Sequence, residues 1–131
     1  MLASFRRRLR RRHIQPHIEL IADGFEIVEA ASERHAVRWA RVTKVATYKL
    51  DHFTTDEIIL AFESTDLPGT TLQASEEWAG FSDLRTAMEQ YLGIAPTWFS
   101  DVMKPAFVTN FRVLYERPDA GTLSDRGLAT G

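Results

Sequence analysis

The longest β-forming run in the chain, residues 36–63, most constrains how the chain can fold. In its second half, apolar side chains occupy every second position, at Ile58, Leu60 and Phe62. This period of two residues is typical of a strand that buries one face. The run therefore predicts a strand-rich core, and the other segments have to pack around it.

The apolar face of this run changes sides between Trp39 and Val42. Up to Trp39 the apolar residues share one parity, and from Val42 to Leu50 they share the other. One extra residue exchanges the two faces of a strand. We therefore predict a bulge or tight bend within residues 40–43. Residues 51–56 are rich in turn formers and predict a hairpin loop.

A second hairpin is predicted over residues 18–28, where Asp23-Gly24 separates two alternating apolar runs. A two-residue type I′ turn here needs a positive φ, which glycine adopts readily. This turn would pair Leu20 with Ile27. The predicted buried face consists of Ile18, Leu20, Ala22, Phe25 and Ile27. Residues 30–35 are expected to form the next turn.

One long helix is predicted over residues 82–92, with Ser82 as N-cap and Gly93 just beyond its end. Its apolar positions follow helical spacing: Leu84, Ala87, Met88, Tyr91 and Leu92. Three shorter elements are expected: a strand over 70–75, a helical turn over 97–103 with Trp98 and Val102 on one side, and an extended segment over 106–116.

The chain of 131 residues is expected to form one domain over residues 17–116, between a basic arm (1–16) and a disordered tail (117–131). It contains no cysteine, which excludes disulfides, thiolate metal sites and a cysteine nucleophile. No apolar run reaches membrane-spanning length, and no signal-peptide core follows the arginines. We therefore expect a cytoplasmic location.

The basic arm contains six arginines: Arg6, Arg7, Arg8, Arg10, Arg11 and Arg12. Residues 13–131 hold the other ten basic residues and all eighteen acidic ones, a net charge of −8. One interpretation is a contact with nucleic acid or an anionic membrane. The alternative, which we favour, is a solvated tail or one that folds back on the acidic body.

The sequence offers little for metal or cofactor chemistry. The four histidines lack the i, i+4 spacing of a zinc protease. A cluster around one loop could in principle bind a cation, but it lacks the pattern of an EF-hand: Asp51, His52, Asp56 and Glu57. Phosphate loops and serine-nucleophile motifs are also missing. We expect no metal site and no cofactor.

The best candidates for acid-base chemistry are Glu76 and Glu77, which directly precede Trp78. With Trp39 and Trp98 they form a candidate pocket. The bland explanation is that the two acids precede a helix and that the tryptophans belong to the core. We expect neither acid to line a cavity with a raised pKa.

Several segments resemble a pleckstrin-homology-like (PH-like) or GRAM-like domain of bacterial families. They are Asp23-Gly24-Phe25, the Trp39, Val42 and Val45 spacing, Tyr48-Lys49-Leu50-Asp51, Asp56-Glu57-Ile58 and residues 76–81 before the helix. The resemblance implies an α+β fold, a mostly antiparallel β meander or partly open barrel with one amphipathic capping helix. It also implies a binding scaffold. The acids around the first hairpin depart from phosphoinositide-binding members, and residues 94–116 lie beyond the usual outline.

These observations predict a non-catalytic PH-like domain that binds another protein. Three alternatives stay open. The first is a small-molecule enzyme with Glu76 or Glu77 as base, and the second is a toxin-neutralising immunity protein. The third is a nucleic-acid or anionic-membrane contact through the arm, residues 6–12. The sequence specifies neither the partner nor the oligomeric state.

Overall fold

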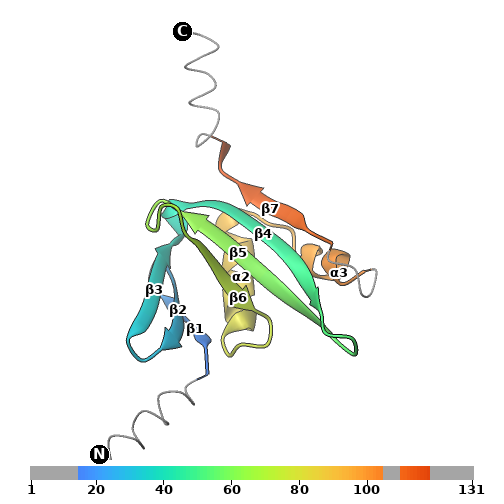
Figure 1. The fold of residues 1–131 in the computed structure, drawn as a ribbon. Helices are drawn as coiled ribbons and strands as arrows, with labels where there is room; N and C mark the ends of the chain where they lie inside the picture. Colours follow the sequence, from blue (N-terminus) through green and yellow to red (C-terminus); the bar gives the residue numbers. More distant parts are fainter. Residues whose placement is uncertain (1–14, 105–109, 119–131) are drawn as a thin grey trace, which may run out of the picture.

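The computed structural model describes residues 15–104 and 110–118 (Figure 1). The fold is α+β, with two antiparallel sheets that stay open and do not close into a barrel. Sheet A has the order β1-β2-β3: β1 (His17–Ile21), β2 (Gly24–Ala30) and β3 (Glu33–Arg38). Sheet B has the order β6-β5-β4-β7: β6 (Thr71–Ser75), β5 (Asp56–Ser64), β4 (Val42–Asp51) and β7 (Arg112–Glu116).

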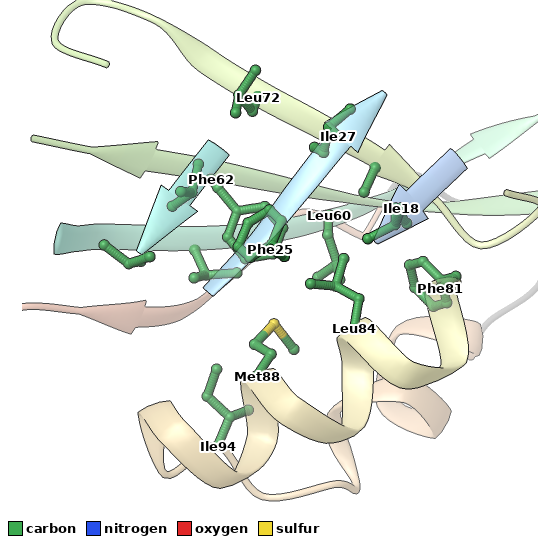
Figure 2. Close-up of a cluster of buried hydrophobic side chains, with 14 of the residues drawn as sticks. Ile18, Phe25, Ile27, Leu60, Phe62, Leu72, Phe81, Leu84, Met88 and Ile94 are labelled. Carbon is green, nitrogen blue, oxygen red and sulfur yellow. The ribbon is translucent and has the colours of Figure 1, made fainter. Parts of the chain in front are cut away.

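Helix α2 (Phe81–Leu92) supplies the third wall of the core (Figure 2). Its buried side chains are Phe81, Leu84 and Met88, which point toward the strands. The fully buried Phe25 of β2 forms the centre of this cluster, and its ring lies 5.0 Å from Trp39 and 4.7 Å from Phe62. One apolar cluster therefore joins both sheets and the helix.

The predicted change of face is a change of sheet. Strand β3 ends at Arg38, a 3₁₀ turn occupies Trp39–Arg41, and β4 begins at Val42 in sheet B. The pairing of β4 with β5 also shifts register between Val42 and Lys44. The predicted bend is confirmed in position. It redirects the whole strand run rather than distorting one strand.

The first hairpin forms, but its predicted register is wrong. Leu20 pairs with Phe25 rather than with Ile27, and Ile21 pairs with Gly24. The two-residue loop is therefore Ala22-Asp23, and Gly24 has no positive φ. A slip of two residues keeps side-chain parity. For that reason Ile18, Phe25 and Ile27 are still buried as expected, although Leu20 and Ala22 are exposed.

The glycine at position 24 is needed for a different reason. A Cβ there would overlap the carbonyl oxygen of Val37 on β3. Close approach of the two backbones, and not turn geometry, excludes a side chain at this position.

Helix α2 begins one residue earlier than predicted. Gly80, with φ of 91°, occupies the N-cap position that the sequence suggested for Ser82. Gly93 takes the left-handed conformation at the other end, as predicted. Tyr91 was expected on the buried face but is exposed, and its ring stacks on Trp39 at 5.6 Å.

The shorter elements are close to expectation. The predicted strand over 70–75 is β6, and the predicted helical turn is α3 (Trp98–Met103), with Trp98 and Val102 buried. One extent was wrong: strand β3 already begins at Glu33, within the turn predicted over residues 30–35. Of the extended segment predicted over residues 106–116, β7 (Arg112–Glu116) forms the end, and residues 106–109 lie outside the described residues. Among the described helices none is long and apolar enough to span a membrane. The arginines of the arm, Phe107 and residues 119–131 lie outside the described residues.

The close approach at Gly24 predicts a large loss of stability in Gly24→Ala. The new methyl group has to displace β3, so we expect the free energy of unfolding to fall by at least about 2 kcal/mol. Urea denaturation measures this change.

Gly69→Ala is the matched control, because Gly69 has φ of 76° but open space around it. It should lose only about 1 kcal/mol through backbone strain. Equal losses in the two variants would show that the contact with β3 is unimportant.

Candidate functional site

The loop between β4 and β5 presents the most exposed large apolar side chain among the described residues. Phe53 is 94% exposed at the tip of this hairpin, and its φ of 68° lies in the left-handed region. Its backbone N–H donates to Oδ1 of Asp51 at 2.9 Å. The N–H of His52 donates to the carbonyl of Thr55, also at 2.9 Å, and closes the loop. Local hydrogen bonds therefore hold Phe53 in a conformation that its side chain disfavours.

This conformation carries a cost that packing does not offset. A left-handed backbone costs a residue with a side chain about 1–2 kcal/mol. Residues in such regions persist where the surrounding structure fixes them, and they are concentrated at functional sites. Phe53 gains almost nothing from burial in return. The tip is therefore a candidate for binding rather than for folding.

The strand that leads to the tip contains a buried lysine. Only 2% of Lys49 is exposed, and its Nζ donates to the carbonyl of Met103 at 2.9 Å. The same nitrogen lies 3.4 Å from a carboxylate oxygen of Asp56. A buried ammonium group needs such partners because desolvation opposes its charge. Lys49 therefore ties the end of α3 to sheet B, next to the tip.

Asn110 completes this arrangement at the end of α3. Its Nδ2 lies within 2.8–3.2 Å of the carbonyl oxygens of Asp101, Val102 and Lys104. The φ of Asn110 is 50°, a conformation that asparagine tolerates better than most residues. The last carbonyls of a helix have no partner within the helix. Here Lys49 and Asn110 contact the carbonyls of the last three residues of α3 and that of Lys104, the residue after the helix. No local sequence pattern indicated this role.

The outer side of the tip is acidic. Glu57 accepts hydrogen bonds from the hydroxyl of Ser75 and from His52 at 2.8 Å, and these contacts lower its pKa. Asp51 is exposed beside Phe53, and Asp56 is mostly buried beside Lys49. Leu50, which is 40% exposed, adds a second apolar side chain. The tip thus presents the exposed apolar side chains of Phe53 and Leu50, with carboxylates nearby.

The predicted pocket is only partly assembled. Glu76 and Trp78 line a hollow of about 340 Å³ together with Gly80, Phe81, Ser82, Arg85 and Phe99. Burial raises the pKa of Glu76, and its Oε1 accepts the backbone N–H of Ile58 at 2.8 Å. The expectation that neither acid would line a cavity with a raised pKa is therefore wrong for Glu76. Glu77 is exposed and does not line the hollow.

The two other tryptophans of the candidate pocket lie elsewhere. Trp39 belongs to the core beside Phe25, as the bland explanation held. Trp98 is buried, and its Nε1 donates to Glu89 at 2.8 Å. Arg85 at the hollow also donates to Glu89 at 2.8 Å and lies 4.4 Å from the ring centroid of Phe99. The polar groups around the hollow are therefore largely used within the protein.

The loop acids do not assemble a metal site. In residues 15–104 and 110–118, no three histidine or carboxylate side chains are placed to hold an ion. His52 binds Glu57, and Asp56 lies beside Lys49. These side chains serve as partners for one another.

The strain at Phe53 predicts that glycine is better for the fold at this position. Phe53→Gly should raise the free energy of unfolding by about 0.5–1 kcal/mol, because glycine adopts a positive φ freely. Phe53→Ala keeps the strain and should change little. Urea titrations distinguish the two results. A loss of stability in Phe53→Gly would show that the ring contributes to folding.

The raised pKa of Glu76 predicts a pH-dependent effect of Glu76→Gln. The folded protein holds this proton more tightly than the unfolded chain, so ionisation of Glu76 lowers stability as the pH rises through the raised pKa. Glutamine cannot ionise and still offers an oxygen to Ile58. The variant should therefore gain more in Tm relative to wild type at about pH 7 than at about pH 4. The opposite trend would contradict the raised pKa.

Comparison with known proteins gave no relative whose function could be considered for this chain. No family model matches the chain, and neither the curated proteins nor the solved structures gave a match.

Proposed function

We propose that this protein is a non-catalytic, PH-like binding domain that contacts another protein through the hairpin tip at Phe53. One observation carries the proposal: Phe53 is 94% exposed and is held at a positive φ. Residues held in a strained backbone conformation are concentrated at functional sites, and burial does not compensate the strain at Phe53. Burial of this ring in a partner would contribute about 1.5–3 kcal/mol.

The charges around the tip define the partner further. Asp51 is exposed beside the ring, whereas Asp56 and Glu57 on β5 are mostly buried beside Lys49 and His52. The carboxylate of Asp51 and the net charge of −8 over residues 13–131 oppose contact with anionic lipid or nucleic acid at this site. They favour a protein surface with an apolar socket and a basic rim, since complementary charges speed association and fix orientation.

The PH-like resemblance supports a binding role and not catalysis. Six antiparallel strands in two sheets precede α2, as in the outline that the resemblance implies. Helix α3 and β7 depart from that outline. Lys49 and Asn110 hold the end of α3 against β4, and β7 pairs with residues 44–47 of the same strand. In this proposal they keep the hairpin base rigid, which lowers the entropic cost of binding.

A second candidate function is a small-molecule enzyme with Glu76 as base. The observation in its favour is the raised pKa of Glu76 in a hollow with aromatic walls. Two contacts reduce its weight: Glu76 holds the N–H of Ile58, and Arg85 holds Glu89. The immunity-protein and arginine-arm alternatives stay predictions, because the described residues supply no observation for either.

Photocrosslinking from position 53 tests the proposal. A benzophenone amino acid in place of Phe53 should give a discrete adduct with one protein in the native host. The same amino acid in place of Tyr91, an aromatic residue that is 61% exposed on α2, is the matched control and should not give it.

Competition makes this experiment decisive. Excess unlabelled wild-type protein should remove the adduct, whereas excess Phe53→Ser protein should not. No adduct at position 53, or equal competition by both proteins, would reject the tip as a binding site. The isolated adduct would identify the partner. Binding of the purified partner, measured at rising salt concentration, would then test whether basic residues surround its apolar socket.

A further inference from the structure

Glu76 differs from the other partly buried carboxylates of the described chain. Each of the other five lies within 3.4 Å of a basic nitrogen: Glu26, Asp56, Glu57, Asp66 and Glu89. Glu76 forms no ion pair with any described residue. Withdrawal from water opposes the charge of a carboxylate unless a positive group compensates it. Within the described residues, this compensation is missing at Glu76.

One oxygen of Glu76 is available to a ligand. Oε1 accepts the backbone N–H of Ile58 at 2.8 Å. Oε2 has no hydrogen-bond donor among the described residues, and it is not sealed from solvent. Burial raises the pKa of Glu76, and the nearby carboxylates of Glu77, Glu57 and Asp56 add to this effect. A positive group at Oε2 would therefore be stabilised by several negative charges.

The hollow in front of Glu76 has aromatic walls. Trp78, Phe81 and Phe99 line it, and its volume is about 340 Å³. The guanidinium of Arg85 already lies 4.4 Å from the ring centroid of Phe99. The half-buried ring of Trp78 contacts no other aromatic ring and no cation among the described residues. Trp78 therefore offers a free ring to an apolar group or a cation.

Two positive groups also face the hollow, and each has its own compensation. Arg85 donates to Glu89 at 2.8 Å and to the carbonyl of Pro96 at 3.1 Å. The partial positive charge at the start of α2 has Asp83 in the first turn of the helix. The charge that lacks a partner at this hollow is therefore the negative charge of Glu76.

We propose that this hollow binds a small primary ammonium ion with an apolar body. The ammonium group donates to the free oxygen of Glu76, and the apolar body lies against Trp78. A charged donor and a charged acceptor form the stronger class of hydrogen bond. The ligand supplies at Glu76 the basic partner that the five other partly buried carboxylates have within the chain.

This site is separate from the tip at Phe53, and the proposal does not depend on the function proposed for that tip. It also differs from the enzyme alternative. A Glu76 carboxylate that is paired with a ligand cation has a lower affinity for a proton, so it is a poorer general base.

Titration with benzylammonium tests the proposal on the full chain. Two-dimensional ¹H–¹⁵N NMR should show saturable shifts of the Trp78 indole N–H and the Ser82 amide. We expect a dissociation constant of about 1 to 10 mM, which is an ordinary binding energy per atom for so small a ligand. Benzyl alcohol, which has the same ring without the charge, should bind at least about tenfold more weakly.

Glu76→Gln assigns the charge preference to one side chain. This variant should bind benzylammonium no better than benzyl alcohol, because glutamine keeps the shape but not the charge. Glu77→Gln is the matched control, since Glu77 is exposed and does not line the hollow. It should change the dissociation constant for benzylammonium by less than about threefold. Circular dichroism checks that both variants are folded.

The pH dependence gives a second readout. Benzylammonium stays charged between about pH 4 and pH 7, whereas Glu76 takes up a proton as the pH falls through its raised pKa. Binding to the wild-type chain should therefore weaken as the pH falls. The same titrations with Glu76→Gln correct for the other carboxylates and should show a smaller change.

Three results would overturn the proposal. The first is the absence of saturable binding of benzylammonium to the full chain. The second is equal affinity of wild type for benzylammonium and benzyl alcohol, which would show that the hollow takes only the ring. The third is a folded Glu76→Gln protein that still prefers benzylammonium.

Discussion

The 3₁₀ turn at Trp39–Arg41 is the constraint on which the rest of the structure depends. It passes the chain from one sheet to the other, and backbone hydrogen bonds fix it from both sides. The N–H of Trp39 donates to Asp23 at 2.9 Å, and the carbonyl of Arg41 accepts from Thr65 at the same distance. The guanidinium of Arg117 reaches the carbonyl of Ala40. Without this turn, the apolar faces of sheets A and B could not meet over α2.

The same fold separates regions that serve stability from a region that does not. Phe25 is fully buried against Trp39 and Phe62, where aromatic contact and burial reinforce each other. Phe53 is nearly fully exposed and strained. Strained residues of this kind are concentrated at functional sites, and this is the ground for the binding role that we propose for Phe53.

The buried charge of Lys49 connects the apolar core to the hairpin that carries Phe53. Lys49 lies on the inner face of β4, where an apolar residue would avoid the desolvation cost of a buried charge. Its ammonium group binds the carbonyl of Met103. Removing one partner of a buried charge is strongly destabilising. Lys49 therefore makes the position of α3 depend on the base of the hairpin.

The sequence by itself determined the elements whose pattern is local. Alternation at Ile58, Leu60 and Phe62 and the helical spacing that ends at Gly93 depend only on neighbours along the chain. The tertiary structure decided the rest, because close backbone approach at Gly24, the burial of Lys49 and the capping role of Asn110 each require a segment distant in sequence.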